Sequence, residues 1–84
     1  MFINVTIEVG GQRRDIRIDS GQKIKEALIV LMQSGKLPMI SPSNRDFPNF
    51  FRSRLNKSLV SSHKTFAQEG VYDGDVLVAL DNQI

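Results

Sequence analysis

Hydrophobic and polar residues alternate over residues 2–19, and Gly10 and Gly11 interrupt the alternation. A period of two is typical of strands buried on one face, and two glycines readily adopt the positive φ angles of a tight turn. We therefore expect a β-hairpin. Pairing Val9 with Gln12 across the turn matches the two apolar faces. This register places Val5 opposite Ile16, Ile3 opposite Ile18, Thr6 opposite Asp15 and Glu8 opposite Arg13.

A helical period follows Ser20 and Gly21. Apolar residues recur at the i, i+3, i+4, i+7, i+8 spacing of an amphipathic helix, at Ile24, Ala27, Leu28, Leu31 and Met32. Gly35 suits the left-handed position after the last turn, and Pro38 cannot continue the helix. The start is less defined, because a capping box from Ser20 needs Glu or Gln three residues later and Lys23 stands there.

Residues 35–49 contain three prolines with Ser, Asn and Asp between them. Such a composition predicts a long irregular connection on the surface. Loops of this length are uncommon and often functional, although a simple spacer from the helix to the next strand also accounts for it.

Two short strands are expected at Phe50–Leu55 and Leu59–Val60, around a turn at Asn56 and Lys57. Either Phe50 or Phe51 must then belong to the core. Thr65 and Gln68 form a capping box over a short helical turn that Gly70 closes, with Phe66 as its buried anchor. A turn at Asp73 and Gly74 precedes a last apolar strand, Val76–Leu80, and leaves 81–84 as a tail.

Strands on both sides of one helix indicate an α+β layer pair, with the helix lying across one face of the sheet. The last strand is almost wholly apolar, so it is best buried beside the first strand. The long connection before it permits parallel pairing, and the sheet is then mixed.

The segment Thr65-Phe66-Ala67-Gln68-Glu69-Gly70-Val71-Tyr72-Asp73-Gly74-Asp75-Val76-Leu77 resembles the approach to the last strand in the ubiquitin-like β-grasp superfamily. The resemblance covers essentially the whole chain. It implies a mixed four- to five-stranded sheet with one amphipathic helix packed across it, in a single domain over residues 1–80.

Within that superfamily, three features are similar to the small bacterial YukD/EsaB proteins of type VII (WXG100) secretion. They are the Met1-Phe2-Ile3 strand, a short basic hairpin and the Gly70-Val71-Tyr72-Asp73-Gly74-Asp75 segment. The Pro-rich 35–49 loop has no counterpart in this pattern.

Ubiquitin and the related sulfur carriers act through a C-terminal Gly-Gly, but this chain ends Asp81-Asn82-Gln83-Ile84. Its adjacent glycines, Gly10 and Gly11, lie in the predicted hairpin turn. The resemblance therefore implies the fold without conjugation.

At 84 residues, the chain has room for one domain, and 40% hydrophobic with 24% charged residues is ordinary for a globular protein. The formal charge of +2 does not by itself indicate nucleic acid. With no cysteine, no leader pattern after Met1 and no apolar run long enough to span a bilayer, we expect a cytoplasmic protein without direct membrane insertion.

Candidate chemistry is sparse. The single histidine, His63, falls in a polar run typical of a surface connector, and neither a catalytic triad nor a metal-ligand set can be assembled around it. Asp73-Gly74-Asp75 is too short for a calcium loop, and glycine motifs that cradle phosphate are missing. We expect no catalytic residue, no metal and no cofactor, and hence no enzyme.

Basic residues gather at Arg52, Arg54, Lys57 and Lys64, with no acidic residue near them. Interleaved Phe50 and Phe51 match the aromatic and basic pattern of single-strand nucleic-acid binders. An acidic protein surface and, before it, a simply solvated face also account for the charges, and the nearly neutral overall balance counts against nucleic acid.

The last strand is apolar on both faces. The resemblance implies that Leu77 and Ala79 point to the helix, so that Val76, Val78 and Leu80 face outward, unless the long loop folds over them.

The leading hypothesis is a ubiquitin-like accessory or regulatory domain, monomeric or homodimeric, that binds a protein partner of a secretion machine, such as a membrane-anchored component. Its candidate binding residues are Val76, Val78, Leu80, Arg52, Arg54 and Lys57. The alternative is a small nucleic-acid-binding module using the basic hairpin of residues 52–64.

Overall fold

The first two strands pair in the register that the alternation predicts. The structure is a computed structural model that describes residues 1–38 and 47–80. Strands β1 (Phe2–Val9) and β2 (Gln12–Asp19) are antiparallel, with Val9 opposite Gln12, Val5 opposite Ile16 and Glu8 opposite Arg13. Gly10 and Gly11 have φ angles of 58° and 83°, which a two-residue hairpin turn of this kind requires.

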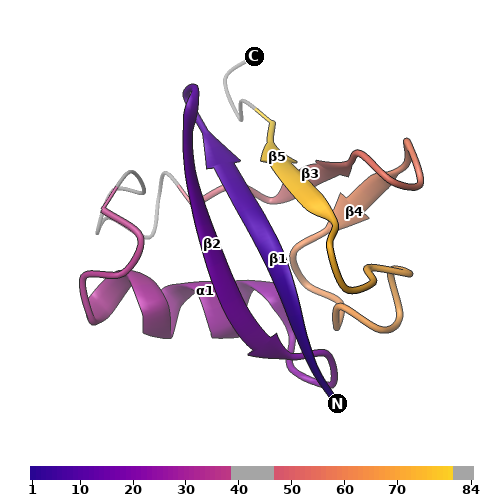
Figure 1. Ribbon diagram of the computed structural model, residues 1–84, viewed down its shortest axis with the longest axis horizontal. Coiled ribbons are helices and arrows are strands. Elements are labelled where there is room, and N and C mark those ends of the chain that lie inside the picture. The colour runs from indigo at the N-terminus through magenta and orange to yellow at the C-terminus, as the bar shows by residue number, and fades with distance from the viewer. Residues whose placement is uncertain (39–46, 81–84) are drawn as a thin grey trace.

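Helix α1 (Ile24–Gln33) lies across one face of the hairpin (Figure 1). Its predicted apolar face is confirmed: Ile24, Ala27 and Leu28 are buried, and Leu31 and Met32 pack partly against the core. Gly35 ends the helix with a φ of 80°. The core side of the sheet and this helix therefore form the two layers expected of an α+β fold.

Helix α1 begins without a side-chain cap, as the sequence around Ser20 and Lys23 indicates. Lys23 occupies the cap position and makes no side-chain capping bond. Instead, the N–H groups of Ile24 and Lys25 donate to the carbonyl oxygens of Lys64 and Ser62, at 2.9 and 2.8 Å. Backbone from a distant loop satisfies donors that a side chain usually satisfies.

The turn between β2 and α1 is held by Asp19, whose Oδ1 accepts a hydrogen bond from the Gly21 N–H at 3.0 Å. This bond, helped by the nearby N-terminal amine, holds the pKa of Asp19 below its ordinary value of 3.8.

Three more strands complete the sheet within the described residues: β3 (Phe50–Ser53), β4 (Leu59–Ser61) and β5 (Val76–Ala79). The strand order is β2-β1-β5-β3-β4, with β5 parallel to β1 and the other neighbours antiparallel. The predicted parallel pairing and mixed sheet are confirmed. Thr65 and Gln68 also form the predicted capping box, each backbone N–H donating to the other side chain at 3.0 Å.

The surface placement expected for residues 35–49 is wrong at both ends of that segment. Leu37 is fully buried and Phe47 is 2% exposed, and both belong to the core. Apolar side chains next to the helix end and before β3 reach the space between the layers, although prolines surround them. Residues 39–46, with Pro42, lie outside the described part of the chain, as does the tail 81–84.

Leu28→Asp should unfold the domain. Leu28 is fully buried, and an unpaired carboxylate there costs several kcal/mol, a large part of the total stability of about 5–15 kcal/mol typical of native proteins. Thermal melting by circular dichroism measures the effect. Val30→Asp is the matched control, because Val30 lies on the same helix and is 61% exposed. A Leu28→Asp variant that melts with the wild type would contradict the packing of α1.

Candidate protein-binding surface on the open sheet face

The face of the sheet turned away from α1, called here the open face, takes its residues from the alternation of each strand. On β5, Leu77 is fully buried beneath α1. Its neighbours Val76 and Val78 must therefore point to the open face, where both are partly exposed. The orientation that the sequence analysis expected for the last strand holds at these positions.

Val78 lies at the centre of a row that crosses the sheet. Its Cα partner is Glu8 on β1 and Arg52 on β3, and the partner of Arg52 on β4 is Leu59. Residues in one such row share a face, so their side chains are neighbours. The sequence could place Arg52 and Val78 on strands, but the sheet order is what brings them together.

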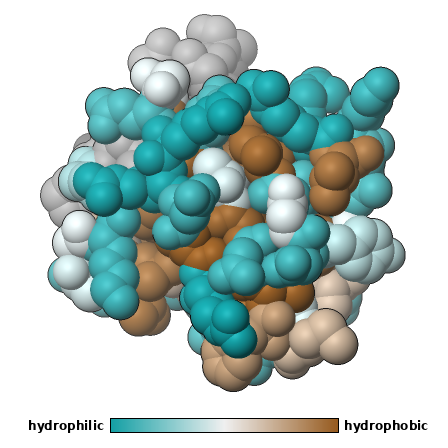
Figure 2. All heavy atoms as spheres, in the orientation of Figure 1, coloured by the Kyte–Doolittle hydropathy of each residue, from teal (hydrophilic) through white to brown (hydrophobic). Residues whose placement is uncertain are grey.

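A shallow depression of about 420 Å³ opens beside this row. Its walls come from β3, β5 and the β3–β4 turn, and it is lined by Arg52, Ser53, Arg54, Lys57, Val78 and Leu80. Figure 2 shows this face, where apolar surface is bordered by hydrophilic side chains. Five of the six predicted site residues meet here. Val76 is on the same face, in the next row opposite Thr6, and does not line the depression.

The β3–β4 turn that carries Arg54 and Lys57 is fixed by a buried carboxylate. Asp75, fully buried, accepts hydrogen bonds from Ser53 Oγ at 2.6 Å, Leu55 N at 3.2 Å and Val76 N at 2.7 Å. Ser53 Oγ in turn accepts a bond from Asn56 N at 3.2 Å. The buried carboxyl oxygens of Asp75 are thus satisfied by donors from the β3–β4 segment and from the start of β5, as buried polar groups require.

Sequence reasoning missed this role of Asp75, because it assigned the segment around Gly74 to a turn and nothing more. A local signal existed: an Asp directly before an apolar strand, at a position where the backbone begins to pair. Its partners lie 20 and 22 residues away in the sequence, and no pattern links them.

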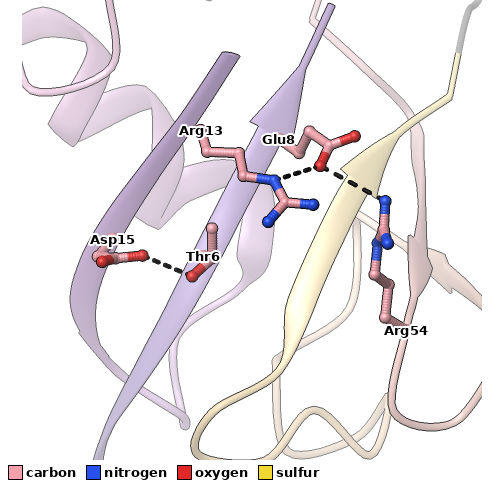
Figure 3. A network of polar contacts seen from close by, with 5 residues as sticks. All are labelled: Thr6, Glu8, Arg13, Asp15 and Arg54. Carbon is pink, nitrogen blue, oxygen red and sulfur yellow. Dashed lines mark hydrogen bonds and ion pairs between the residues drawn. The ribbon is translucent and has the colours of Figure 1, made fainter. Parts of the chain in front are cut away.

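Glu8 on β1 forms ion pairs with Arg13 of the hairpin and with Arg54 at the depression (Figure 3). Its Oε1 accepts a hydrogen bond from Arg13 Nε at 2.7 Å, the cross-strand pair that the register predicts, and lies 3.5 Å from an Arg54 terminal nitrogen. The Glu8 side chain is 16% exposed, which reduces solvent screening of both pairs. Arg54 is therefore partly neutralised. Within residues 1–38 and 47–80, Arg52 and Lys57 form no ion pair.

The two phenylalanines of β3 lie on opposite faces of the sheet. Phe51 is fully buried, whereas Phe50 is 42% exposed on the open face. The aromatic pair that suggested single-strand stacking therefore offers one exposed ring at most. Lys64, the fourth basic residue of the predicted cluster, is exposed but does not line the depression.

The described residues that were considered for catalysis or metal binding do not come together in one site. His63 is exposed, and no group of three or more His, Asp or Glu residues within the described ranges could hold a metal ion. Helix α1 has ten residues, and no helix in residues 1–38 or 47–80 is long and apolar enough to cross a membrane.

No protein-family model and no curated protein matches the chain. Solved structures do. The ubiquitin-like domain of Dsk2 from Plasmodium falciparum has a TM-score of 0.54 and 18% identity, over 95% of this chain and all of that one. The EccD5 ubiquitin-like domain from Mycobacterium xenopi has a TM-score of 0.53 and 14% identity, over 99% of both chains.

A structure of an Arabidopsis thaliana protein has a TM-score of 0.61 and 12% identity, over 99% of this chain and 89% of that one. At such identities the likeness establishes the fold. The fold is thus a ubiquitin-like β-grasp of the α+β class, as the sequence analysis expected.

Asp75→Ala should destabilise the domain by about 2–4 kcal/mol, because it leaves buried donors without an acceptor. Urea unfolding measures the loss. Asp75→Asn is the matched control and should cost less than Asp75→Ala, since its oxygen can still accept both backbone N–H groups and only the Ser53 hydroxyl loses its acceptor. Equal losses in the two variants would show that the hydrogen bonds of Asp75 do not hold the turn.

Proposed function

We propose that this chain is a non-catalytic ubiquitin-like domain, over residues 1–80, that binds a protein partner through the depression on its open face. The observation that carries the proposal is an apolar floor, Val78 and Leu80, beside two cations, Arg52 and Lys57, that have no ion pair within the described residues. Such a surface suits an acidic partner with an apolar side chain that fills the depression.

The biological setting we propose is an accessory or regulatory role in bacterial type VII (WXG100) secretion, in the cytoplasm, with a membrane-anchored component of that machine as the partner. The resemblance of the N-terminal strand and of the segment 70–75 to the YukD/EsaB proteins supports this setting. A bacterial ubiquitin-like domain, that of EccD5, is among the structural neighbours. The fold alone is common to many functions, so the setting depends on the sequence resemblance.

Val78→Asp should reduce partner capture at least about tenfold while leaving the melting temperature nearly unchanged, because Val78 is partly exposed and central in the site. The measurement is affinity capture from a lysate of the native host, with bound proteins quantified by mass spectrometry. Val30→Asp is the control, since it adds the same charge on the exposed side of α1. A partner retained equally by the wild type and by both variants would remove the depression from the binding surface.

A nucleic-acid role for residues 52–64 makes a different prediction. Three phosphate contacts to a single strand give a slope of about −2 in a plot of log affinity against log salt concentration. We expect no such binding to a dT oligonucleotide, because Phe51 is buried and Glu8 partly neutralises Arg54. Filter binding over a salt series decides the matter. A steep slope that disappears in an Arg52→Ala, Lys57→Gly double variant would favour nucleic acid, and glycine suits the positive φ of Lys57.

A further inference from the structure

Among the strands that the structure describes, β2 is an edge of the sheet and has a neighbour on one side only (Figure 1). It is eight residues long, whereas the opposite edge, β4, has three. Natural proteins usually blunt a long edge, because its unpaired N–H and C=O groups attract another strand. The long outer side of β2 is therefore a surface on which another strand could pair.

The hydrogen bonds of β1 show which groups of β2 point outward. Thr6 donates its N–H to Asp75 O at 2.9 Å, so its backbone faces β5 and not β2. Asp15, opposite Thr6, must then turn its own N–H and C=O away from β1. Alternate residues of a strand direct their backbone groups to the same side, so the N–H and C=O groups of Arg13 and Arg17 also point away from β1. Within the described residues, nothing hydrogen-bonds to the backbone of these three residues from the outer side.

The side chains of the same residues alternate in sign. Arg13, Asp15, Arg17 and Asp19 project on the open face of β2 as plus, minus, plus, minus. An edge guarded against pairing usually carries charges that repel a second copy. This alternation does the reverse, because two copies placed antiparallel can bring opposite charges to facing positions.

We propose that β2 pairs antiparallel with β2 of a second copy of this chain, about a two-fold axis at Ile16. In this register Asp15 of each copy lies opposite Arg17 of the other, and Arg13 lies opposite Asp19. Opposite charges stabilise facing positions of a strand pair. The two central Asp15–Arg17 pairs are hydrogen-bonded positions, so they add backbone bonds to the ion pairs. The contact is isologous and closes as a dimer.

Neighbouring registers are disfavoured by the same charges. Moving the axis to Asp15 brings Asp15 opposite Asp15 and Arg13 opposite Arg17. Moving it to Arg17 opposes Arg17 to Arg17 and Asp15 to Asp19, and moving it to Arg14 opposes two Arg14 side chains. Like charges at facing positions destabilise a strand pair. An axis at Arg14 or at Ile18 still makes two opposite-charge pairs, Arg13 with Asp15 or Arg17 with Asp19, whereas the axis at Ile16 makes four, so the alternation favours Ile16.

The helix side of the edge leaves room for the second copy. A groove of about 420 Å³ lies between β2 and the end of α1, lined by Ile16, Leu31, Gly35 and Lys36 together with Arg14, Asp15 and Arg17. The two Ile16 side chains meet at the axis, over this groove. The depression at β3 and β5 is at the far side of the sheet order and stays free in the dimer.

Sedimentation equilibrium of the full chain over a concentration series tests the proposal. The paired surface is small, so we expect a reversible dimer with Kd of about 100 µM. Asp15→Arg and Arg17→Asp should each weaken the dimer at least about tenfold, because symmetry repeats the change and each variant dimer contains two like-charged pairs. An equimolar mixture of the two variants should restore a dimer, since each then faces the opposite charge in the other. Lys64→Glu, an exposed change away from β2, should leave association as in the wild type.

Amide hydrogen exchange locates the contact. Raising the concentration should slow exchange at Arg13, Asp15 and Arg17, while Arg14 and Ile16 are already protected by β1 in the monomer. A wild-type chain that is monomeric at about 1 mM overturns the proposal. So does a dimer that the single variants leave intact, or a variant mixture that stays monomeric. Protection of the three amides by a different protein, in a chain that does not self-associate, would assign the edge to that partner instead.

Discussion

The position of β5 between β1 and β3 is the constraint on which the rest of this structure depends. A strand presents alternate side chains to opposite faces, so burying Leu77 under α1 commits Val76 and Val78 to the open face. The parallel pairing with β1 then places Val78 beside Glu8, and the antiparallel pairing with β3 places it beside Arg52. The fold and the candidate site are consequences of one register.

Local signals in the sequence predicted most of the fold. The hairpin register follows from Gly10, Gly11 and the alternation around them, and the face of α1 follows from its period. Thr65 and Gln68 form their capping box as expected, since both partners lie within four residues. Each of these features is decided by residues close in sequence, where hydrophobic period and turn chemistry act directly.

The features that the sequence did not reveal depend on distant partners. The N–H groups of α1 are satisfied by carbonyls of Ser62 and Lys64, some 40 residues later, so no cap was needed at Lys23. Leu37 and Phe47 enter the core from a segment whose prolines suggested a surface loop. For the candidate site, the sequence placed the proposed residues on strands and a turn but did not predict the contacts that hold them together, because Asp75 and Glu8 act between separate strands.

The charges distinguish two surfaces, for which we propose different partners. On β2 the four open-face charges, Arg13, Asp15, Arg17 and Asp19, sum to zero and alternate, which suits a second copy and gives no preference for acidic or basic proteins. At the depression the balance differs, since Glu8 reaches Arg54, whereas Arg52 and Lys57 have no ion pair among residues 1–38 and 47–80. If the open faces of two copies came together, Arg52 and Lys57 of one copy would repel those of the other, so self-association does not neutralise this surface. Its excess charge is complementary to an acidic partner, and the edge and the open face can be occupied at the same time.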